Sequence, residues 1–262
     1  MDHFQAKDGE TARDVFGRRV ERYAALDVFS DEKYYRPLLE MARPASGERV
    51  LDVAAGTGLL ASLMARDAAE VVGTDVTPEM LSLARDRIRK TGQTNVSFIE
   101  ADAAAPPFDK GFFDLVTCRT AFHHFPEPVK VLGEIYSVLR EAGRFVMEDV
   151  YGPDDDALRA TRESFERLVD PSHVLAYRPS ELEAMLSAAG FSVELERKPS
   201  ARDFSLDLIL RLDRVEDPED RAAIVAILDS NLDTDLGGFS ASRVDGELVL
   251  RWRTIIIAAV KN

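Results

Sequence analysis

Residues 50–58 read Val-Leu-Asp-Val-Ala-Ala-Gly-Thr-Gly, a short apolar run that passes directly into a turn of small residues. Apolar residues then recur at helical spacing, which predicts a helix within residues 57–66. Small residues let the backbone approach a ligand closely, and the first turn of a helix offers N–H groups that are not used inside the helix. The segment therefore predicts a strand, a tight ligand-binding turn and a helix, in that order.

The same alternation continues on the C-terminal side. Strands are expected at residues 49–54, 70–74, 96–100, 113–118 and 144–150, and amphipathic helices begin between them at Pro78 and Pro128. Strands that alternate with helices predict βαβ units around a parallel sheet, and such crossovers are right-handed. The expected fold class is therefore α/β, with a Rossmann-like doubly wound sheet.

The flanking regions follow other patterns. Residues 1–45 are predicted to form polar N-terminal helices, and residues 46–262 to form one domain. In that domain, helices are expected at residues 154–169 and 179–189, and a strand at residues 191–197. Residues 248–260 are predicted to be one long terminal strand. Residues 199–246 are predicted to be a mostly helical insertion before it, either a mobile cover or the surface of a homodimer.

Composition excludes several classes of protein. The 262 residues carry a net charge of −14, which argues against nucleic acid and against anionic membrane surfaces as partners. The longest apolar run, Ile255 to Val260, is far short of the ~18 residues of a membrane span, and no signal peptide is expected because residues 1–10 lack an apolar stretch. A single cysteine excludes a disulfide framework, and four histidines leave little for a metal cluster. We therefore expect a cytoplasmic protein that acts on a small molecule and holds no metal.

Two classes of cofactor use a strand, a glycine turn and a helix. Residues 56–61 fit the Gly-x-Gly-x-x-Ala dinucleotide pattern, and Asp75 stands where an acid would bind a ribose in either class. Asp52 precedes the glycines, where a carboxylate suits a cationic sulfonium and ammonium better than a pyrophosphate. Asp102 follows the third strand and can accept a hydrogen bond from an adenine amine, and no Lys or Arg stands where a pyrophosphate needs one. S-adenosylmethionine is therefore favoured over a nicotinamide dinucleotide.

Residues 49–150 resemble the class I S-adenosylmethionine-dependent methyltransferases, in the branch of the ubiquinone and menaquinone C-methyltransferases. The resemblance rests on the segments VLDVAAGTG, VVGTDVTPEMLSLAR, FIEADAAAPPF, FDLVTCRTAFHHFPEP and LREAGRFVMEDV. Residues 15–30 resemble the helix that covers the cofactor in that branch, and residues 151–191 resemble one subgroup of uncharacterised bacterial members. The resemblance implies seven strands in the order 3-2-1-4-5-7-6, with the last strand antiparallel.

The resemblance also implies roles for individual residues. The methionine end of the cofactor would be lined by Asp52, Ala54, Gly56 and Gly58, where Ala54 replaces a glycine and is expected to need only a negative φ. The nucleoside end would be bound by Asp75, Val76, Met80, Asp102 and Ala103. Cys118 and Arg119 would lie beneath the sulfonium, although Cys118 also fits a simple packing role. Tyr23 would cover the methionine carboxylate, and Arg19 or Arg22 would neutralise it, unless both arginines lie on a solvated helix face.

The chemistry of methyl transfer narrows the search for catalytic residues. The cofactor supplies an activated carbon, so the protein mainly orients the reactants, and a base is needed only where the acceptor must lose a proton. The candidates for this base are His123 and His124 after the fourth strand and Tyr151 after the fifth, with His173 as an outside candidate. Either of the paired histidines alternatively packs as a neutral ring. Of Glu148 and Asp149, at most one should face the site, because adjacent strand residues point to opposite faces.

The function predicted from the sequence is the transfer of a methyl group from S-adenosylmethionine to oxygen, nitrogen or carbon of a small molecule. S-adenosyl-L-homocysteine would be the product. Arsenic is disfavoured as the acceptor, because only Cys118 is available to bind it. Two alternatives stay open at this point: a protein that binds S-adenosylmethionine without transferring methyl groups, and a nicotinamide-dependent oxidoreductase.

Overall fold

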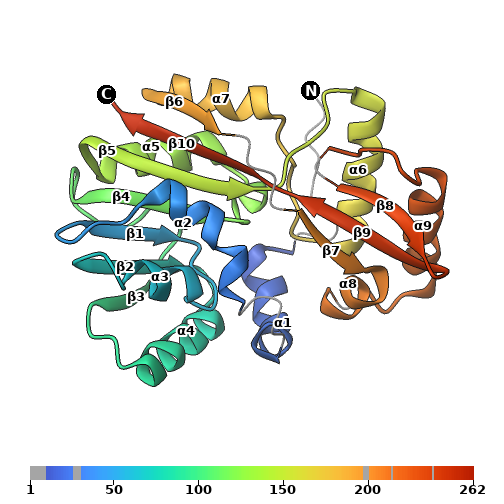
Figure 1. Ribbon diagram of the computed structural model, residues 1–262, viewed down its shortest axis with the longest axis horizontal. Helices are drawn as coiled ribbons and strands as arrows, with labels where there is room; N and C mark the ends of the chain where they lie inside the picture. Colours follow the sequence, from blue (N-terminus) through green and yellow to red (C-terminus); the bar gives the residue numbers. More distant parts are fainter. Residues whose placement is uncertain (1–9, 26–30, 197–200, 214, 238) are drawn as a thin grey trace.

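A computed structural model describes residues 10–25, 31–196, 201–213, 215–237 and 239–262. Its main sheet has seven strands in the order β3-β2-β1-β4-β5-β10-β6 (Figure 1). These strands are β1 (Arg49–Val53), β2 (Glu70–Asp75), β3 (Val96–Glu100), β4 (Phe113–Arg119), β5 (Leu139–Asp149), β6 (Phe191–Glu196) and β10 (Ile255–Lys261). The pairs among β1 to β5 are parallel, and β10 is antiparallel to both β5 and β6. The expected fold and strand order are confirmed, with β10 in the position of the expected seventh strand.

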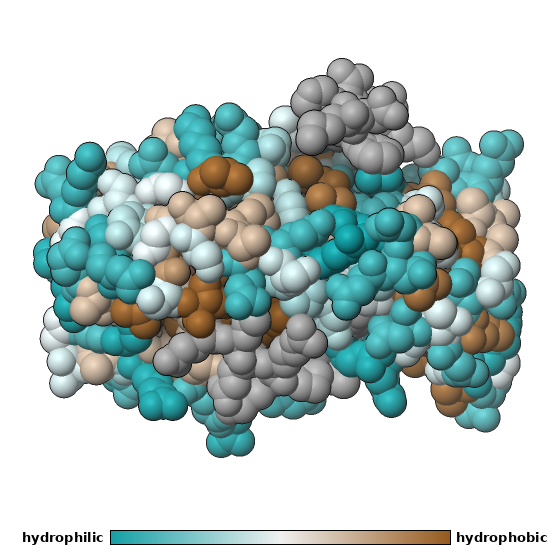
Figure 2. All heavy atoms as spheres, turned by 90° about the horizontal axis from the view of Figure 1, so that it is seen from above, coloured by the Kyte–Doolittle hydropathy of each residue, from teal (hydrophilic) through white to brown (hydrophobic). Residues whose placement is uncertain are grey.

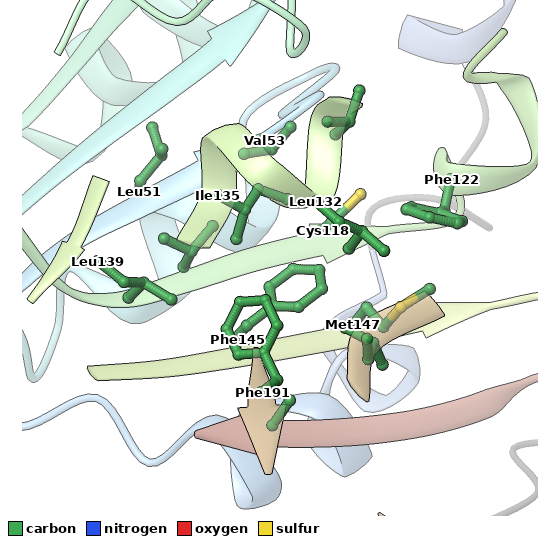
Figure 3. Packing of buried hydrophobic residues seen from close by; sticks show 14 of the residues in the cluster. Leu51, Val53, Cys118, Phe122, Leu132, Ile135, Leu139, Phe145, Met147 and Phe191 are labelled. Carbon is green, nitrogen blue, oxygen red and sulfur yellow. The ribbon is translucent and has the colours of Figure 1, made fainter. Parts of the chain in front are cut away.

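Helices bury both faces of this sheet. The helices are α2 (Arg36–Ala42), α3 (Leu59–Met64), α4 (Pro78–Thr91), α5 (Pro128–Val138) and α7 (Pro179–Ala188). Because side chains alternate along a strand, Leu51 packs in one apolar core with α5 and α7, and its neighbour Val50 packs in another with α2 and α3. Figure 3 shows part of the first core, in which Phe145 and Phe191 lie side by side. Two buried faces explain why the central strands read as continuous apolar runs.

The insertion differs from its prediction. It contains the helices α8 (Leu206–Leu212) and α9 (Pro218–Ser230), but also β7 (Ala201–Ser205), β8 (Phe239–Val244) and β9 (Glu247–Arg253). These strands form a second, antiparallel sheet in the order β7-β9-β8. The prediction of a mostly helical insertion is therefore wrong for a substantial part of the segment. Helix α6 (Asp156–Val169) packs with this sheet, α8 and α9 around a separate apolar core.

The predicted terminal strand at residues 248–260 is in fact two strands. Strands β9 and β10 are separated only by Thr254, and they run nearly in line from the small sheet to the main sheet (Figure 1). The chain stays extended through this point, where it reads Arg-Trp-Arg-Thr, but its hydrogen-bonding partners change from β7 and β8 to β5 and β6. This change of partners brings the insertion next to the edge of the main sheet where β5 ends.

The N-terminal helix α1 (Ala12–Ala25) packs against α4 and α8, and a short 3-10 helix (Glu32–Tyr34) precedes α2. Within the described ranges, no helix is long and apolar enough to cross a bilayer. The face in Figure 2 is mostly hydrophilic, and its apolar patches are small and scattered, as expected for a strongly charged chain.

Candidate active site

The turn after β1 has an unusual backbone conformation. Ala54, Gly56 and Gly58 all have positive φ values, of 54°, 52° and 73°. The expectation that Ala54 needs only a negative φ is therefore wrong. The reason lies in the hydrogen bonds, because the N–H of Ala55 donates to the carbonyl oxygen of Thr74 in β2 at 2.8 Å and so bends the chain sharply after β1. A left-handed alanine is strained by about 1–2 kcal/mol, and such strain occurs most often at functional sites.

Asp75, at the end of β2, holds this turn in place. Its Oδ2 accepts the N–H of Gly56 at 2.8 Å, and its Oδ1 accepts the N–H of Thr77 at 2.9 Å. Burial raises the pKa of this carboxyl. The carboxylate thus connects the ends of β1 and β2, and Asp75 lines the same cavity as the turn.

Asp52 presents a buried carboxylate oxygen that is available for a ligand. Its Oδ1 accepts the hydroxyl of Thr117 at 2.8 Å, whereas Oδ2 finds no hydrogen-bond partner among the described residues. The side chain is 1% exposed, and this burial raises its pKa to about 7. An unpaired buried acceptor is costly, so a donor or cation bound in the cavity would stabilise it.

Arg119, at the end of β4, presents the complementary group. Its Nε donates to Oε2 of Glu148 at 2.8 Å, and its guanidinium lies 4.1 Å from the ring centroid of Tyr35. Its Nη2 is buried and has no hydrogen-bond partner in the described part of the chain. Both Asp52 and Arg119 line the cavity. Together they offer an acceptor and a donor, the pair that the ammonium and carboxylate of an α-amino acid require.

The cavity encloses about 1150 Å³ at the carboxyl edge of the main sheet. Most of the residues predicted for the cofactor line it, namely Asp52, Ala54, Gly56, Asp75, Val76, Met80, Asp102, Ala103 and Arg119. Its volume exceeds the roughly 300–1000 Å³ of a typical site for one small ligand, so it has room for a cofactor together with an acceptor. The remaining walls come from α1, α6 and the insertion.

Several predicted residues lie elsewhere. Gly58 faces away from the cavity, where a Cβ atom would meet Ala84 and Phe98 at 2.7 Å. Cys118 is buried in the core beside Leu132 and Met147 (Figure 3), and its burial raises the pKa of the thiol. Tyr151 packs against the same core and is not among the described residues that line the cavity, so no base is expected there. The side chain of Tyr23 lies outside the described residues.

Arg19 and Arg22 do not serve the predicted role. Arg19 is only 3% exposed and forms ion pairs with Asp170 at 3.0 Å and with Asp213 at 2.9 Å. Its guanidinium also donates to backbone carbonyls of the same region, so it joins α1 to α6 and α8. Arg22 donates to the carbonyl oxygen of Arg211. Neither a methionine-binding role nor a solvated helix face describes Arg19, because its partners come from the end of α6 and from the insertion, both distant in the sequence.

The two adjacent histidines differ sharply. Nδ1 of His123 lies 2.5 Å from Oδ1 of Asp149, whose other oxygen accepts the N–H of Phe122 at 2.6 Å. Burial alone would lower the pKa of His123, but Asp149 outweighs this effect and raises it. His124 instead places its Nδ1 3.1 Å from the carbonyl oxygen of Ser172, and burial lowers its pKa to about 3. His124 is therefore a neutral ring that packs against Phe16, whereas His123 is coupled to a carboxylate.

The acids at the end of β5 both have partners from other elements. Glu148 accepts from Arg119 and from the hydroxyl of Thr254 at 2.7 Å, and Asp149 binds His123. Both are buried, and neither lines the cavity. Each instead positions a residue that does. His173, the outside candidate, lines the cavity and lies 3.0 Å from Glu163 through its Nε2.

These groups fit S-adenosylmethionine. The unpaired atoms of Asp52 and Arg119 match its amino-acid end, and Asp75 and Asp102 match its ribose and adenine. In the described lining, the arginines are Arg119 and Arg13, and Arg13 pairs with Glu100 at 3.0 Å. This charge pattern suits a cationic cofactor and disfavours a pyrophosphate. In the described residues, no cluster of acids, histidines and cysteines could hold a metal ion.

Comparison with known proteins gives the same assignment. Residues 44–190 match the family model described as "Methyltransferase domain". The uncharacterized methyltransferase YcgJ of Bacillus subtilis is 36% identical over 173 residues, which cover 66% of this chain and 68% of YcgJ. The demethylmenaquinone methyltransferase of Thermus thermophilus is 37% identical over 206 residues, which cover 70% of this chain and 93% of the relative.

A solved structure extends the match to most of the chain. The crystal structure of the YcgJ protein from Bacillus subtilis superposes with a TM-score of 0.82 at 28% identity and covers 88% of this chain and 99% of that one. Fold, site and relatives together define an S-adenosylmethionine-dependent methyltransferase. The chain belongs to the methyltransferase-domain family, and its matched region, residues 44–190, contains the glycine turn and both histidines but neither α1 nor the insertion.

Proposed function

We propose that the protein methylates a small organic molecule at an atom that must lose a proton, and that His123 accepts this proton. The observation that carries the proposal is the contact of 2.5 Å between His123 and Asp149 at the wall of the cavity. Asp149 occupies Nδ1 of the ring, so Nε2 is the nitrogen that would take a proton from an acceptor. Hydroxyl groups, amines and acidic carbons all fit this requirement.

The cofactor, when bound, supplies an activated methyl group and leaves as S-adenosyl-L-homocysteine. In the proposed arrangement, Asp52 receives its ammonium group and Arg119 its carboxylate, because these two residues hold the unpaired buried atoms. Asp75 binds the ribose hydroxyls, Val76 and Met80 contact the adenine, and Asp102 accepts from the adenine amine. Glu148 keeps Arg119 in place by accepting a hydrogen bond from Nε of the arginine.

Orientation provides most of the expected acceleration. Holding two reactants in line is worth effective molarities of about 10⁵ M or more, or roughly 7 kcal/mol upward, whereas one base contributes about 10²- to 10⁴-fold. The walls that would hold the acceptor come from α1, α6, α8 and β9. They exclude water and keep the acceptor next to His123.

The direct test is formation of S-adenosyl-L-homocysteine from S-adenosylmethionine with a panel of phenols, primary amines and cyclic 1,3-diketones. These three groups separate transfer to oxygen, nitrogen and carbon. We expect turnover with at least one group, and we expect His123→Gln to lower kcat by about 10²-fold or more with little change in cofactor affinity. Cofactor binding without turnover on any group would contradict the proposal and would favour a binding protein that transfers no methyl group.

A further inference from the structure

One part of the cavity is lined by residues from α1, the loop of His123 and His124, α6 and the insertion. We call it the acceptor chamber and define it by the following lining residues: Phe16, His123, His124, Val150, Glu166, Val169, Asp170, Ser172, His173, Phe204, Ile209, Leu212, Asp213 and Trp252. None of these belongs to the loops that follow β1, β2 and β3. Its residues between Phe204 and Trp252 lie outside the segment that matches the family model, so the family assignment does not account for them.

The insertion gives this chamber an apolar aromatic wall. Phe204 lies on β7, Ile209 and Leu212 on α8, and Trp252 on β9. The ring of Trp252 stacks on Phe239 at 5.4 Å and meets the ring of Phe204 edge-on at 6.5 Å. These residues belong to helices and strands with their own apolar core, so the wall is held in position. Such a surface binds apolar ligands by removing water from both partners.

The charged side chains of the chamber are already paired with neighbouring groups. Its described lining contains the carboxylates of Glu166, Asp170 and Asp213 but no lysine or arginine. The nearby guanidinium of Arg19 is occupied by Asp170, Asp213 and two carbonyls. A second guanidinium, that of Arg162, pairs with Glu166 at 2.8 Å. His123 also lines the chamber, but it must be neutral to act as the proposed base. A ligand with a negative charge would therefore enter a buried space without a counterion, which is costly.

We infer that the acceptor chamber selects an apolar, ring-bearing acceptor without a negative charge, and that the aromatic wall of the insertion determines this specificity. The inference rests on the proposed function, because it specifies the molecule that receives the methyl group. It excludes carboxylates and phosphate esters as acceptors. It also assigns residues 201–253 a role in binding the substrate, beyond covering the site.

The chain carries its own reporter for this inference. Trp252 is its single tryptophan and lies in the wall of the chamber, so its fluorescence responds to a ligand there. We would saturate the protein with S-adenosyl-L-homocysteine and titrate it with 4-tert-butylphenol or 4-tert-butylbenzoate, which have similar shapes but differ in charge. The phenol should change the fluorescence, and it should bind at least about 30-fold more tightly than the benzoate, since one unpaired buried charge costs at least that much.

A variant that adds a positive charge to the chamber provides the second part of the test. Phe204 lines the chamber and is only partly buried, so Phe204→Arg adds a counterion there. This variant should lose about tenfold in phenol affinity and gain at least about tenfold in benzoate affinity. Val244→Arg is the matched control, because Val244 belongs to the same insertion but is 52% exposed and lies outside the chamber. Trp252→Phe should abolish the fluorescence response while phenol binding, measured by calorimetry, stays within about threefold.

Similar affinities for the phenol and the benzoate, or an unchanged ratio in Phe204→Arg, would overturn the inference. So would the absence of phenol binding by both fluorescence and calorimetry. These outcomes are separate from failure of the proposed function, because no readout depends on methyl transfer. Failure of the wild-type protein to bind S-adenosyl-L-homocysteine would instead overturn the proposed function itself.

Discussion

Nδ1 of His123 lies 2.5 Å from Oδ1 of Asp149, and the same carboxylate accepts the backbone N–H groups of Phe122 and Val150. The histidine comes from the loop after β4, whereas the aspartate ends β5. Because the backbone fixes the carboxylate, the imidazole is held in one orientation with Nε2 away from Asp149. Asp149, at the end of β5, therefore sets both the orientation and the pKa of His123, which follows the neighbouring strand β4.

This pair predicts how the rate depends on pH. His123 accepts a proton only when it is neutral, and Asp149 raises its pKa above the ordinary value of about 6.5. The value of kcat/KM should therefore rise with pH, with a midpoint above about 6.5. In Asp149→Asn the charge that raises the pKa is lost, so the midpoint should move to lower pH and kcat should fall by about tenfold or more. A midpoint that stays in place in Asp149→Asn would contradict the assignment of His123.

Asp52 predicts a different pH dependence, in cofactor binding. Its pKa of about 7 means that near neutral pH it must lose a proton before it can pair with the ammonium group of the ligand. The affinity for S-adenosyl-L-homocysteine should therefore fall as the pH drops below about 7, by up to about tenfold per pH unit. Asp52→Asn should bind about 10-fold more weakly at about pH 8 and should lose this dependence. Calorimetry across this pH range measures the affinity of both proteins. If the affinity of Asp52→Asn fell with pH as steeply as that of the wild-type protein, Asp52 would not be the source of the pH dependence.

The sequence predicts the main sheet well because each central strand is short, apolar and followed by a helix with its own start and stop residues. It fails in the insertion, where β7 reads Ala-Arg-Asp-Phe-Ser and β8 reads Phe-Ser-Ala-Ser-Arg-Val. These strands are short and mostly polar, so their pairing with β9 decides their conformation. The break at Thr254 is not predicted either, because the chain stays extended on both sides of it and only its hydrogen-bonding partners change.

The candidate site is predictable only where its residues have a fixed place in a motif. Asp52, Asp75 and Asp102 follow from their positions at the ends of strands, and all three line the cavity. The partners that tune the site come from distant segments: Glu148 holds Arg119, and Asp149 holds His123. Trp252, in the chamber wall, lies more than a hundred residues after His123 and His124, which line the same cavity. No local pattern in the sequence records such contacts.

His124 predicts an effect of acid on stability. In the folded protein burial lowers its pKa to about 3, whereas in the unfolded chain it is about 6.5. Below about pH 6.5 the unfolded chain therefore binds a proton that the folded protein excludes, and stability falls as the pH drops, by up to about 1.4 kcal/mol per pH unit from this group. His124→Gln keeps a donor for the carbonyl of Ser172 but does not titrate, so its stability should fall less steeply.

Urea unfolding between about pH 6.5 and about pH 4.5 measures this difference. His123→Gln is an internal control. The pKa of His123 is raised in the folded protein, so it adds stability that is fully present below about pH 6.5 and is lost as the pH rises through that raised pKa. Between about pH 6.5 and about pH 4.5 both the folded and the unfolded chain hold this proton, so His123→Gln should leave the slope in acid nearly unchanged. Parallel slopes for the wild-type protein and His124→Gln would show that His124 is not a buried neutral ring.

Gly56 and Gly58 allow strain and packing in the cofactor turn to be separated. Both have a positive φ, so alanine at either position should cost about 1–2 kcal/mol, partly offset by the lower entropy of the unfolded chain. A Cβ at Gly56 meets nothing within 4 Å, whereas at Gly58 it would lie 2.7 Å from Ala84 and Phe98. Gly58→Ala should therefore be less stable than Gly56→Ala by about 1–3 kcal/mol in urea unfolding, because α4 must shift to accommodate the methyl group. Ala54→Gly should add roughly 0.5 kcal/mol by releasing the same backbone strain. Equal losses at the two glycines would mean that the turn does not pack against α4 as described.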